Sequence, residues 1–233
     1  IGILEGEDRI SLEDSLISYF PEYQVDDQDG KLEKITIRTL LTMSNGHPDV
    51  PDRHGCDDEV RTFLEYPIVH EPGTVFMYDS MGTNMLAAVV KRVTGYNLFQ
   101  FLRFRVLEPM GIYGADCDSC TSGKDQGGGG SRLKTEDMAK ITILYVNKGK
   151  WNGKQLVPAE YIREASRAQV DNGAQGYGYL FWRGPYDSYR ADGKYGQLSI
   201  VIPQKETVIA INAESRDATG MMNCCMDVIV PQL

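Results

Sequence analysis

Two short segments of the chain have side chains whose type and spacing are used in nucleophilic catalysis, and the first is Ser131-Arg-Leu-Lys134. A hydroxyl and an amine three residues apart can act together when both project from one turn of a helix. Here Thr135-Glu-Asp starts the next predicted helix, so Ser131 and Lys134 precede it, and extended residues three apart point to opposite faces. We interpret the pair as a coincidence of spacing.

The second segment is Tyr78-Asp-Ser80-Met-Gly82, which matches the latter half of Gly-x-Ser-x-Gly, the strained turn that presents the nucleophile of α/β-hydrolases. The first Gly of that motif is missing. The acid and the His of that fold follow the Ser along the chain, whereas His47, His54 and His70 all precede Ser80. Chain order therefore excludes this hydrolase class.

Metal and phosphate motifs are incomplete. Cys117-Asp-Ser-Cys120 has the spacing of half a zinc site, but neither a second pair nor a suitably spaced His accompanies it. Gly123-Lys124-Asp125 lacks both the hydroxyl after the Lys and the Gly five residues earlier that a phosphate-binding loop requires. The sequence therefore predicts neither a metal site nor a cofactor.

The overall charge limits the class of partner. The 233 residues include 24 basic and 33 acidic side chains, a formal charge of −9, and 42% of them are hydrophobic. A net anion is not attracted to nucleic acid or to an anionic membrane, so a small molecule or a peptide is the expected ligand. The longest useful apolar run, Met85–Val90, is far too short to span a bilayer.

The sequence is compatible with more than one cellular compartment. Five cysteines, two of them adjacent, do not resemble a disulfide framework and favour a reducing, cytoplasmic compartment. The chain opens on Ile1 without an initiator Met and resembles the interior of a longer protein, so an extracytoplasmic location is also compatible. Gly127–Ser131 reads GGGGS, which fits a natural loop or an engineered linker, although no change of domain accompanies it.

The elements that must position the candidate residues fall into two groups. Helices are expected first, at 12–20, 37–44, 60–67, 80–93, 98–111, 136–149 and 158–169, with one more at 220–230. Strands are expected at 176–183, 188–193, 197–203 and 207–214. Late strands without alternating βαβ units predict an α+β fold, in which helices flank an antiparallel sheet. We expect one partial domain over 1–233, with a helical lobe at roughly 11–170 and a sheet portion at roughly 175–233.

Six segments occur together in the order and spacing of one known family. The chain resembles the serine β-lactamases and penicillin-binding proteins, nearest the class C-like branch, which also contains D-amino-acid peptidases and esterases. The resemblance covers essentially the whole chain and implies a β-lactamase/transpeptidase-like fold. The segments are ISLEDSLISYFPEY, ITIRTLLTMSNG, EPGTVFMYDSMGTNMLAAVVKRVTG, FLRFRVLEPMGI, GGGGSRLKTEDMAKI and YGYLFWR…ADGKYGQLSIVIPQKETVIAIN.

The resemblance implies roles for particular residues. Tyr78-Asp79-Ser80 matches the family's Tyr-x-Asn/Ser element, which makes Tyr78 the expected general base or proton relay and Ser80 a substrate contact. A phenol with a pKa near ~10 can do this only beside a cation that stabilises its phenolate, and in this family a Lys provides it. The plain alternative is that Tyr78 is a core aromatic residue that leads into a helix.

The family's Lys/His-x-Gly element falls on Ala191-Asp192-Gly193, where Ala191 replaces the usual cation. By analogy, Gly193 lets the strand approach substrate, and the backbone N–H of Lys194 donates to the developing oxyanion. The Lys194 side chain could serve as a replacement cation or point to solvent. Asp192 could face substrate or cap a turn.

The family's Ser-x-x-Lys element is absent, and residues 1–14 resemble the part that follows it. The resemblance therefore implies a fragment that lacks the nucleophile helix and N-terminal strands, is poorly stable alone and is inactive without an upstream segment of the same protein. The complete protein is expected to hydrolyse an amide, ester or β-lactam through an acyl-enzyme. Alternatives are a non-catalytic module that binds peptides or cell-wall fragments, and an esterase or amidase marked by the missing cation at Ala191.

Overall fold

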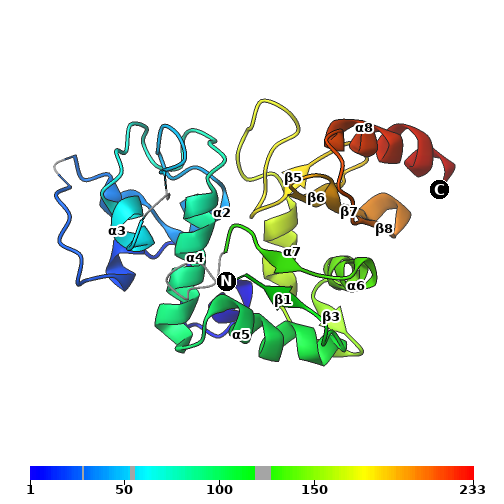
Figure 1. Ribbon diagram of the computed structural model, residues 1–233, viewed down its shortest axis with the longest axis horizontal. Coiled ribbons are helices and arrows are strands. Elements are labelled where there is room, and N and C mark those ends of the chain that lie inside the picture. The colour runs from blue at the N-terminus through cyan, green and yellow to red at the C-terminus, as the bar shows by residue number, and fades with distance from the viewer. Residues whose placement is uncertain (28, 53–55, 119–126) are drawn as a thin grey trace.

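The computed structural model describes residues 1–27, 29–52, 56–118 and 127–233. Figure 1 shows helices α2–α5 gathered at one side of the molecule and the largest sheet at the other, with α6 and α7 adjoining it. The helices are α1 Gly2–Glu5, α2 Ile37–Leu41, α3 Glu59–Leu64, α4 Ser80–Thr94, α5 Leu98–Leu102, α6 Thr135–Val146, α7 Ala159–Ser166 and α8 Ala218–Asn223. The strands are β1 Asp116–Cys117, β2 Ser131–Arg132, β3 Lys150–Trp151, β4 Lys154–Gln155, β5 Trp182–Arg183, β6 Tyr189–Gly193, β7 Gln197–Ile202 and β8 Thr207–Ile211. This mixture of helices and antiparallel sheet confirms the predicted α+β class.

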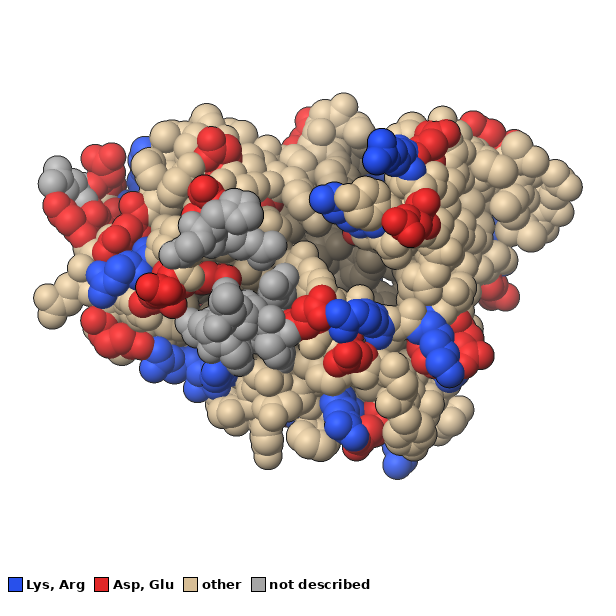
Figure 2. All heavy atoms as spheres, viewed as in Figure 1, with Lys and Arg blue, Asp and Glu red and all other residues tan. Residues whose placement is uncertain are grey.

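The main sheet has four antiparallel strands in the order β5-β6-β7-β8. Leu198 and residues 200–202 of β7 are buried, so the second half of this strand is buried on both faces. Leu198 and Ile200 pack with Cys225 and Met226 of the C-terminal helical segment. Helix α6 packs against β7 and β8. The sheet is thus covered by helices that lie far apart in the sequence (Figure 1). On the face seen in Figure 2, acidic and basic side chains lie among one another over both the helical part and the sheet.

Helix α4 forms the centre of the helical part, and its boundaries follow from its ends. Asp79 is the N-cap, because its side chain accepts from the Met81 backbone N–H, and Gly95 ends the helix with a φ of 78°. Buried residues of α4, including Met81 and Met85, pack against α2 and α3 in one continuous core. The helix predicted over 80–93 is therefore confirmed.

The helix expected over 12–20 was wrong in extent, because only Leu16–Tyr19 forms a 3-10 turn. The capping contacts do form: Ser11 N donates to Asp14 Oδ2 at 2.7 Å. However, the backbone oxygens of Leu12 and Asp14 accept from the N–H groups that start α2. Those carbonyls bind another segment, so they do not continue a helix of their own.

The strand expected over 176–183 was also too long, since only Trp182 and Arg183 pair with β6. The preceding residues fold back on themselves: Gly178 N donates to the Phe181 backbone oxygen at 2.8 Å, and Leu180 has a φ of 61°. Leu180 N also donates to the Leu41 backbone oxygen at 2.9 Å. This segment therefore connects the helical part to the sheet.

Candidate active site

Tyr78 immediately precedes the N-cap of α4, where the backbone is still extended. Its side chain is 45% exposed, while its neighbour Asp79 is fully buried. Ser80 is the first residue of α4 and contacts the backbone of Gly128, where an added Cβ would lie 2.7 Å from the Ser80 backbone oxygen. Ser80 therefore lies two residues after Tyr78, at the first helical position of α4.

Strand β6 carries Asp192 and Gly193 at an edge with which no other strand of the described residues pairs. β5 pairs with β6 only at Tyr189 and Arg190, whereas β7 pairs along its whole length. Residues 191–193 are exposed. Gly193 lies opposite Gln197, and a Cβ there would meet the Gln197 Cβ at 2.8 Å. The absence of a side chain at Gly193 thus permits close strand spacing at this edge.

Lys194 begins the hairpin turn that joins β6 to β7. Its ammonium nitrogen lies 5.1 Å from the centroid of the Tyr195 ring, a cation–π geometry. Gly196, with a φ of 89°, closes the same turn by donating its N–H to the Gly193 backbone oxygen at 3.3 Å. The Lys194 side chain is therefore engaged with its own turn.

Aromatic rings connect Tyr78 to the sheet. The Tyr78 ring stacks on the Trp182 indole, with centroids 5.7 Å apart and an interplanar angle of 19°. Trp182 also meets Phe76 and Tyr177 edge-on, at 5.7 and 5.0 Å. We call these four residues the aromatic wall. No motif marks the other three members as site residues in the sequence, although the aromatic density of residues 177–182 is a visible signal.

Arg190 and Asp192 form an ion pair beside this wall. Arg190 Nε lies 2.9 Å from Asp192 Oδ1, and the two side chains are 19% and 31% exposed. Because residues two apart on a strand share a face, and Arg190 is the cross-strand partner of Trp182, Asp192 lies on the Trp182 side of the sheet. The carboxylate is therefore a neighbour of the aromatic wall.

The electrostatics at Tyr78 oppose formation of a phenolate. Burial and then the Asp192 carboxylate raise the pKa of Tyr78 above its usual value of 10.0. Burial also raises the pKa of Asp192, and Arg190 partly offsets that rise. Among the described residues no cation lowers the pKa of Tyr78, so this part of the molecule by itself does not prepare the phenol to accept a proton.

The other sequence candidates lie away from this arrangement. Ser131 belongs to β2, and Lys134 is the extended residue before α6, so the interpretation of their spacing as coincidence is supported by the structure. His54, Cys120 and Gly123–Asp125 lie outside the described residues. In the ranges that the structure describes, no group of three His, Cys, Asp or Glu side chains could hold a metal ion. Nor does any helix there have the length and hydropathy to cross a membrane.

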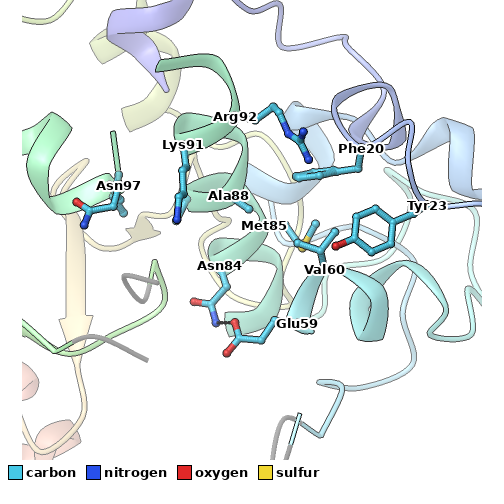
Figure 3. Close-up of a pocket in the computed structure, with 12 residues that line it drawn as sticks. Phe20, Tyr23, Glu59, Val60, Asn84, Met85, Ala88, Lys91, Arg92 and Asn97 are labelled. Atoms are coloured by element: carbon cyan, nitrogen blue, oxygen red, sulfur yellow. Dashed lines mark hydrogen bonds between the residues drawn. The ribbon is translucent and has the colours of Figure 1, made fainter. Parts of the chain in front are cut away.

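A separate cavity of about 400 Å³ lies beside α4, on the helical side of the molecule (Figure 3). Several of its polar side chains already have partners. Asn84 Nδ2 donates to Glu59 Oε2 at 3.0 Å, and Asn84 Oδ1 accepts from Gly128 N at 2.9 Å. Arg92 lies over the Phe20 ring, 5.3 Å from its centroid, and pairs with Glu22. This cavity therefore offers less reactive chemistry than the surroundings of Tyr78.

The helices that flank the four-stranded antiparallel sheet define the class of β-lactamase/transpeptidase-like folds. The profile of the Beta-lactamase family matches residues 1–221, and the chain belongs to that family. The family prediction from the sequence is thus confirmed.

Individual relatives are distant and longer. Protein flp of Staphylococcus aureus (strain MW2) is 26% identical over 115 residues, which cover 46% of this chain and 23% of that protein. Lovastatin esterase of Penicillium rubens is 33% identical over 92 residues, covering 34% of this chain and 23% of that protein. A solved structure provisionally assigned as a 6-aminohexanoate-dimer hydrolase from Bacillus anthracis superimposes with a TM-score of 0.81 at 21% identity, covering 98% of this chain and 68% of that one. The matched region thus spans under a quarter of each curated relative.

Proposed function

We propose that residues 1–233 form the larger part of a hydrolase domain that cleaves esters or amides through an acyl-enzyme. The observation that carries this proposal is the stack of an accessible Tyr78 on Trp182 beside the edge of β6 that carries Gly193. The family membership and the likeness to an esterase support the reaction class.

In the proposed reaction a serine oxygen attacks the carbonyl carbon, and Tyr78 takes the proton of that serine and passes it to the leaving alcohol or amine. The carbonyl oxygen becomes an oxyanion that accepts from the Lys194 N–H and from the N–H of the nucleophile. Water then attacks the acyl-enzyme and releases the acid. Gly193 and Ser80 would contact the bound substrate.

We further propose that the nucleophilic serine and its lysine lie outside residues 1–233. The raised pKa of Tyr78 supports this assignment, because a phenol in this environment needs an added cation to act as a base near neutral pH. Such a lysine would supply the missing positive charge. The 233-residue chain alone would then be catalytically inactive.

We propose a substrate without a carboxylate near the reacting carbonyl. Ala191 stands where the family's usual cation would be, and the adjacent Asp192 carboxylate would repel a second carboxylate. Arg190, which is adjacent to Ala191, is already paired with the Asp192 carboxylate, and Lys194 interacts with Tyr195. Neutral esters and amides therefore fit this edge better than β-lactams that carry a carboxylate.

The test compares the full-length protein with the 233-residue chain. We expect a fluorophosphonate to label the full-length protein at one serine outside this region and to leave the chain unlabelled. Turnover of a neutral ester should fall about a hundredfold or more in Tyr78→Phe, because the proton relay is lost. Tyr113→Phe is the matched control, since Tyr113 is 78% exposed and should leave turnover unchanged.

Two results would contradict the proposal. Specific labelling of the 233-residue chain would place the nucleophile inside it. Faster turnover of a carboxylate-bearing β-lactam than of a neutral ester would remove the proposed role of Asp192. Peptide binding by a full-length protein without any turnover would instead support the non-catalytic module.

A further inference from the structure

The backbone on both sides of Tyr78 is held by the segment that follows α2. Met77 N donates to the Met43 backbone oxygen at 2.7 Å. Asp79 N lies 3.2 Å from the Met43 sulfur. Tyr78, between these two contacts, is the exposed member of the segment. The direction of its side chain therefore depends on how firmly Met77 and Asp79 are held.

Asp79 is a fully buried carboxylate with converging donors. Its Oδ1 accepts from Met81 N at 2.8 Å, and its Oδ2 accepts from Asn45 Nδ2 at 2.6 Å. The Nδ1 atom of His47 lies 3.5 Å from the same Oδ2, and both side chains have zero exposure. A buried carboxylate is costly unless several donors satisfy it, so each of these groups restrains the start of α4.

His47 is placed for an electrostatic role toward Asp79. Its ring packs between Phe63 and Tyr66, with centroids 4.5 and 5.3 Å away, and its backbone N donates to Asn45 Oδ1 at 3.0 Å. Among the described residues neither ring nitrogen makes a full hydrogen bond. An apolar ring would fill this space without the cost of burying a nitrogen that lacks a hydrogen-bond partner. Packing alone therefore does not explain a histidine at this position. The Nδ1 atom faces the Asp79 carboxylate, which accounts for the choice of histidine.

We infer that His47 is a positioning residue for Tyr78. A proton on Nδ1 is attracted to Asp79 Oδ2, which holds the N-cap of α4 and aims the preceding phenol at Trp182 and the edge of β6. At 3.5 Å this is an electrostatic contact that shortens to a hydrogen bond with a small movement of the ring. The catalytic consequence rests on the proposed function, whereas the structural consequence for Tyr78 does not.

Two substitutions at His47 separate this role from simple packing. His47→Asn keeps an N–H donor near the position of Nδ1 and loses the ring, whereas His47→Phe keeps the ring between Phe63 and Tyr66 and loses the donor. We expect kcat for a neutral ester in the full-length enzyme to fall about tenfold to a hundredfold in His47→Phe with little change in KM. His47→Asn should rescue most of this loss.

A fluorescence measurement reports the position of Tyr78 without requiring catalysis. The emission of Trp182 is obtained in the full-length protein by subtracting the spectrum of the same variant carrying Trp182→Phe. We expect His47→Phe to change this emission, because Tyr78 moves off the indole, and His47→Asn to preserve it. Asp137→Asn is the control, since Asp137 is buried at the start of α6 and pairs with Lys140 at 2.8 Å.

The kcat values and the Trp182 emission of the two His47 variants together decide whether His47 positions Tyr78. A normal kcat and unchanged Trp182 emission in His47→Phe, with losses in His47→Asn, would show that His47 acts by packing alone. Equal effects of both substitutions on emission would also overturn it. If the full-length protein hydrolyses no ester, the proposed function fails, and the emission of the two variants still decides whether His47 positions Tyr78.

Discussion

Tyr78 and Trp182 stack almost in parallel, at 19°, although one precedes helix α4 and the other belongs to strand β5. Offset stacking of two aromatic rings contributes about 0.5–1.5 kcal/mol beyond the burial of their area. Trp182 is also the cross-strand partner of Arg190, which pairs with Asp192. The indole therefore links the phenol to the charged sheet edge.

Replacing Trp182 should destabilise the fold more than its partial exposure suggests. Trp182→Ala removes contacts with three other rings of the aromatic wall, and we expect the free energy of unfolding to fall by about 2–4 kcal/mol. Urea unfolding measures this loss. Tyr113→Ala removes a similarly large but highly exposed ring and should change stability by less than about 0.5 kcal/mol. Equal losses in the two variants would show that the wall has no special role.

Removing the Asp192 charge should lower the pKa of Tyr78. The carboxylate is ionised throughout the range in which a phenol titrates, so its negative charge opposes the phenolate and raises that pKa. In Asp192→Asn the Tyr78 titration, followed by ultraviolet absorbance and assigned with Tyr78→Phe, should shift to lower pH. Asp8→Asn, an exposed change in the turn after α1, should leave it in place. A rise in the pKa of Tyr78 in Asp192→Asn would show that the Asp192 carboxylate does not oppose the phenolate.

Much of the fold could be predicted because its signals are local. Asp79 and Gly95 mark the two ends of α4 in the sequence itself, and the Gly193–Gly196 turn separates strands β6 and β7. The segments that were predicted wrongly are those whose backbone groups form hydrogen bonds with distant parts of the chain. Leu12 bonds to the start of α2, and Leu180 bonds to Leu41, and neither partner is visible in the local pattern.

The candidate site could be predicted only in part for the same reason. Tyr78 and Gly193 were found through motifs that recur at fixed positions in a family. Trp182 joins them through a tertiary contact, and His47 reaches Asp79 from the segment that follows α2. Chain order excludes His47 from an α/β-hydrolase triad, but its buried position beside Asp79 depends on the packed core and has no signal in the local sequence.

A side chain at Gly193 should force the edge of the sheet apart. An added Cβ would lie 2.8 Å from both Cβ and Oε1 of Gln197, and the Gln197 amide is held by a 2.6 Å bond to the Ala213 backbone oxygen. We expect Gly193→Ala to lower the free energy of unfolding by about 1–3 kcal/mol, measured by urea unfolding. Gly129→Ala meets no atom within 4 Å and is the control. An unchanged free energy of unfolding in Gly193→Ala would show that the Gln197 side chain moves aside at little energetic cost.

Tyr145 should make the folded state less stable at alkaline pH. Its ring packs against Phe181 and Tyr189, and burial raises its pKa from 10.0 to about 12. Below pH 10 the phenol is protonated in both the folded and the unfolded state, so it has no effect there. Between pH 10 and 12 the unfolded state loses the proton first, so stability falls with rising pH by roughly 3 kcal/mol in total.

The comparison of wild type with Tyr145→Phe isolates this contribution. Urea unfolding at several values between pH 9 and pH 12 should show a shallower decline of stability in the variant, because phenylalanine has no proton to lose. Other buried tyrosines, such as Tyr189, still titrate in the variant, so the decline is reduced and not abolished. Since the difference between the two proteins arises only above pH 10, a gap of constant size from pH 9 upward would mean that Tyr145 acts through packing and not through its hydroxyl.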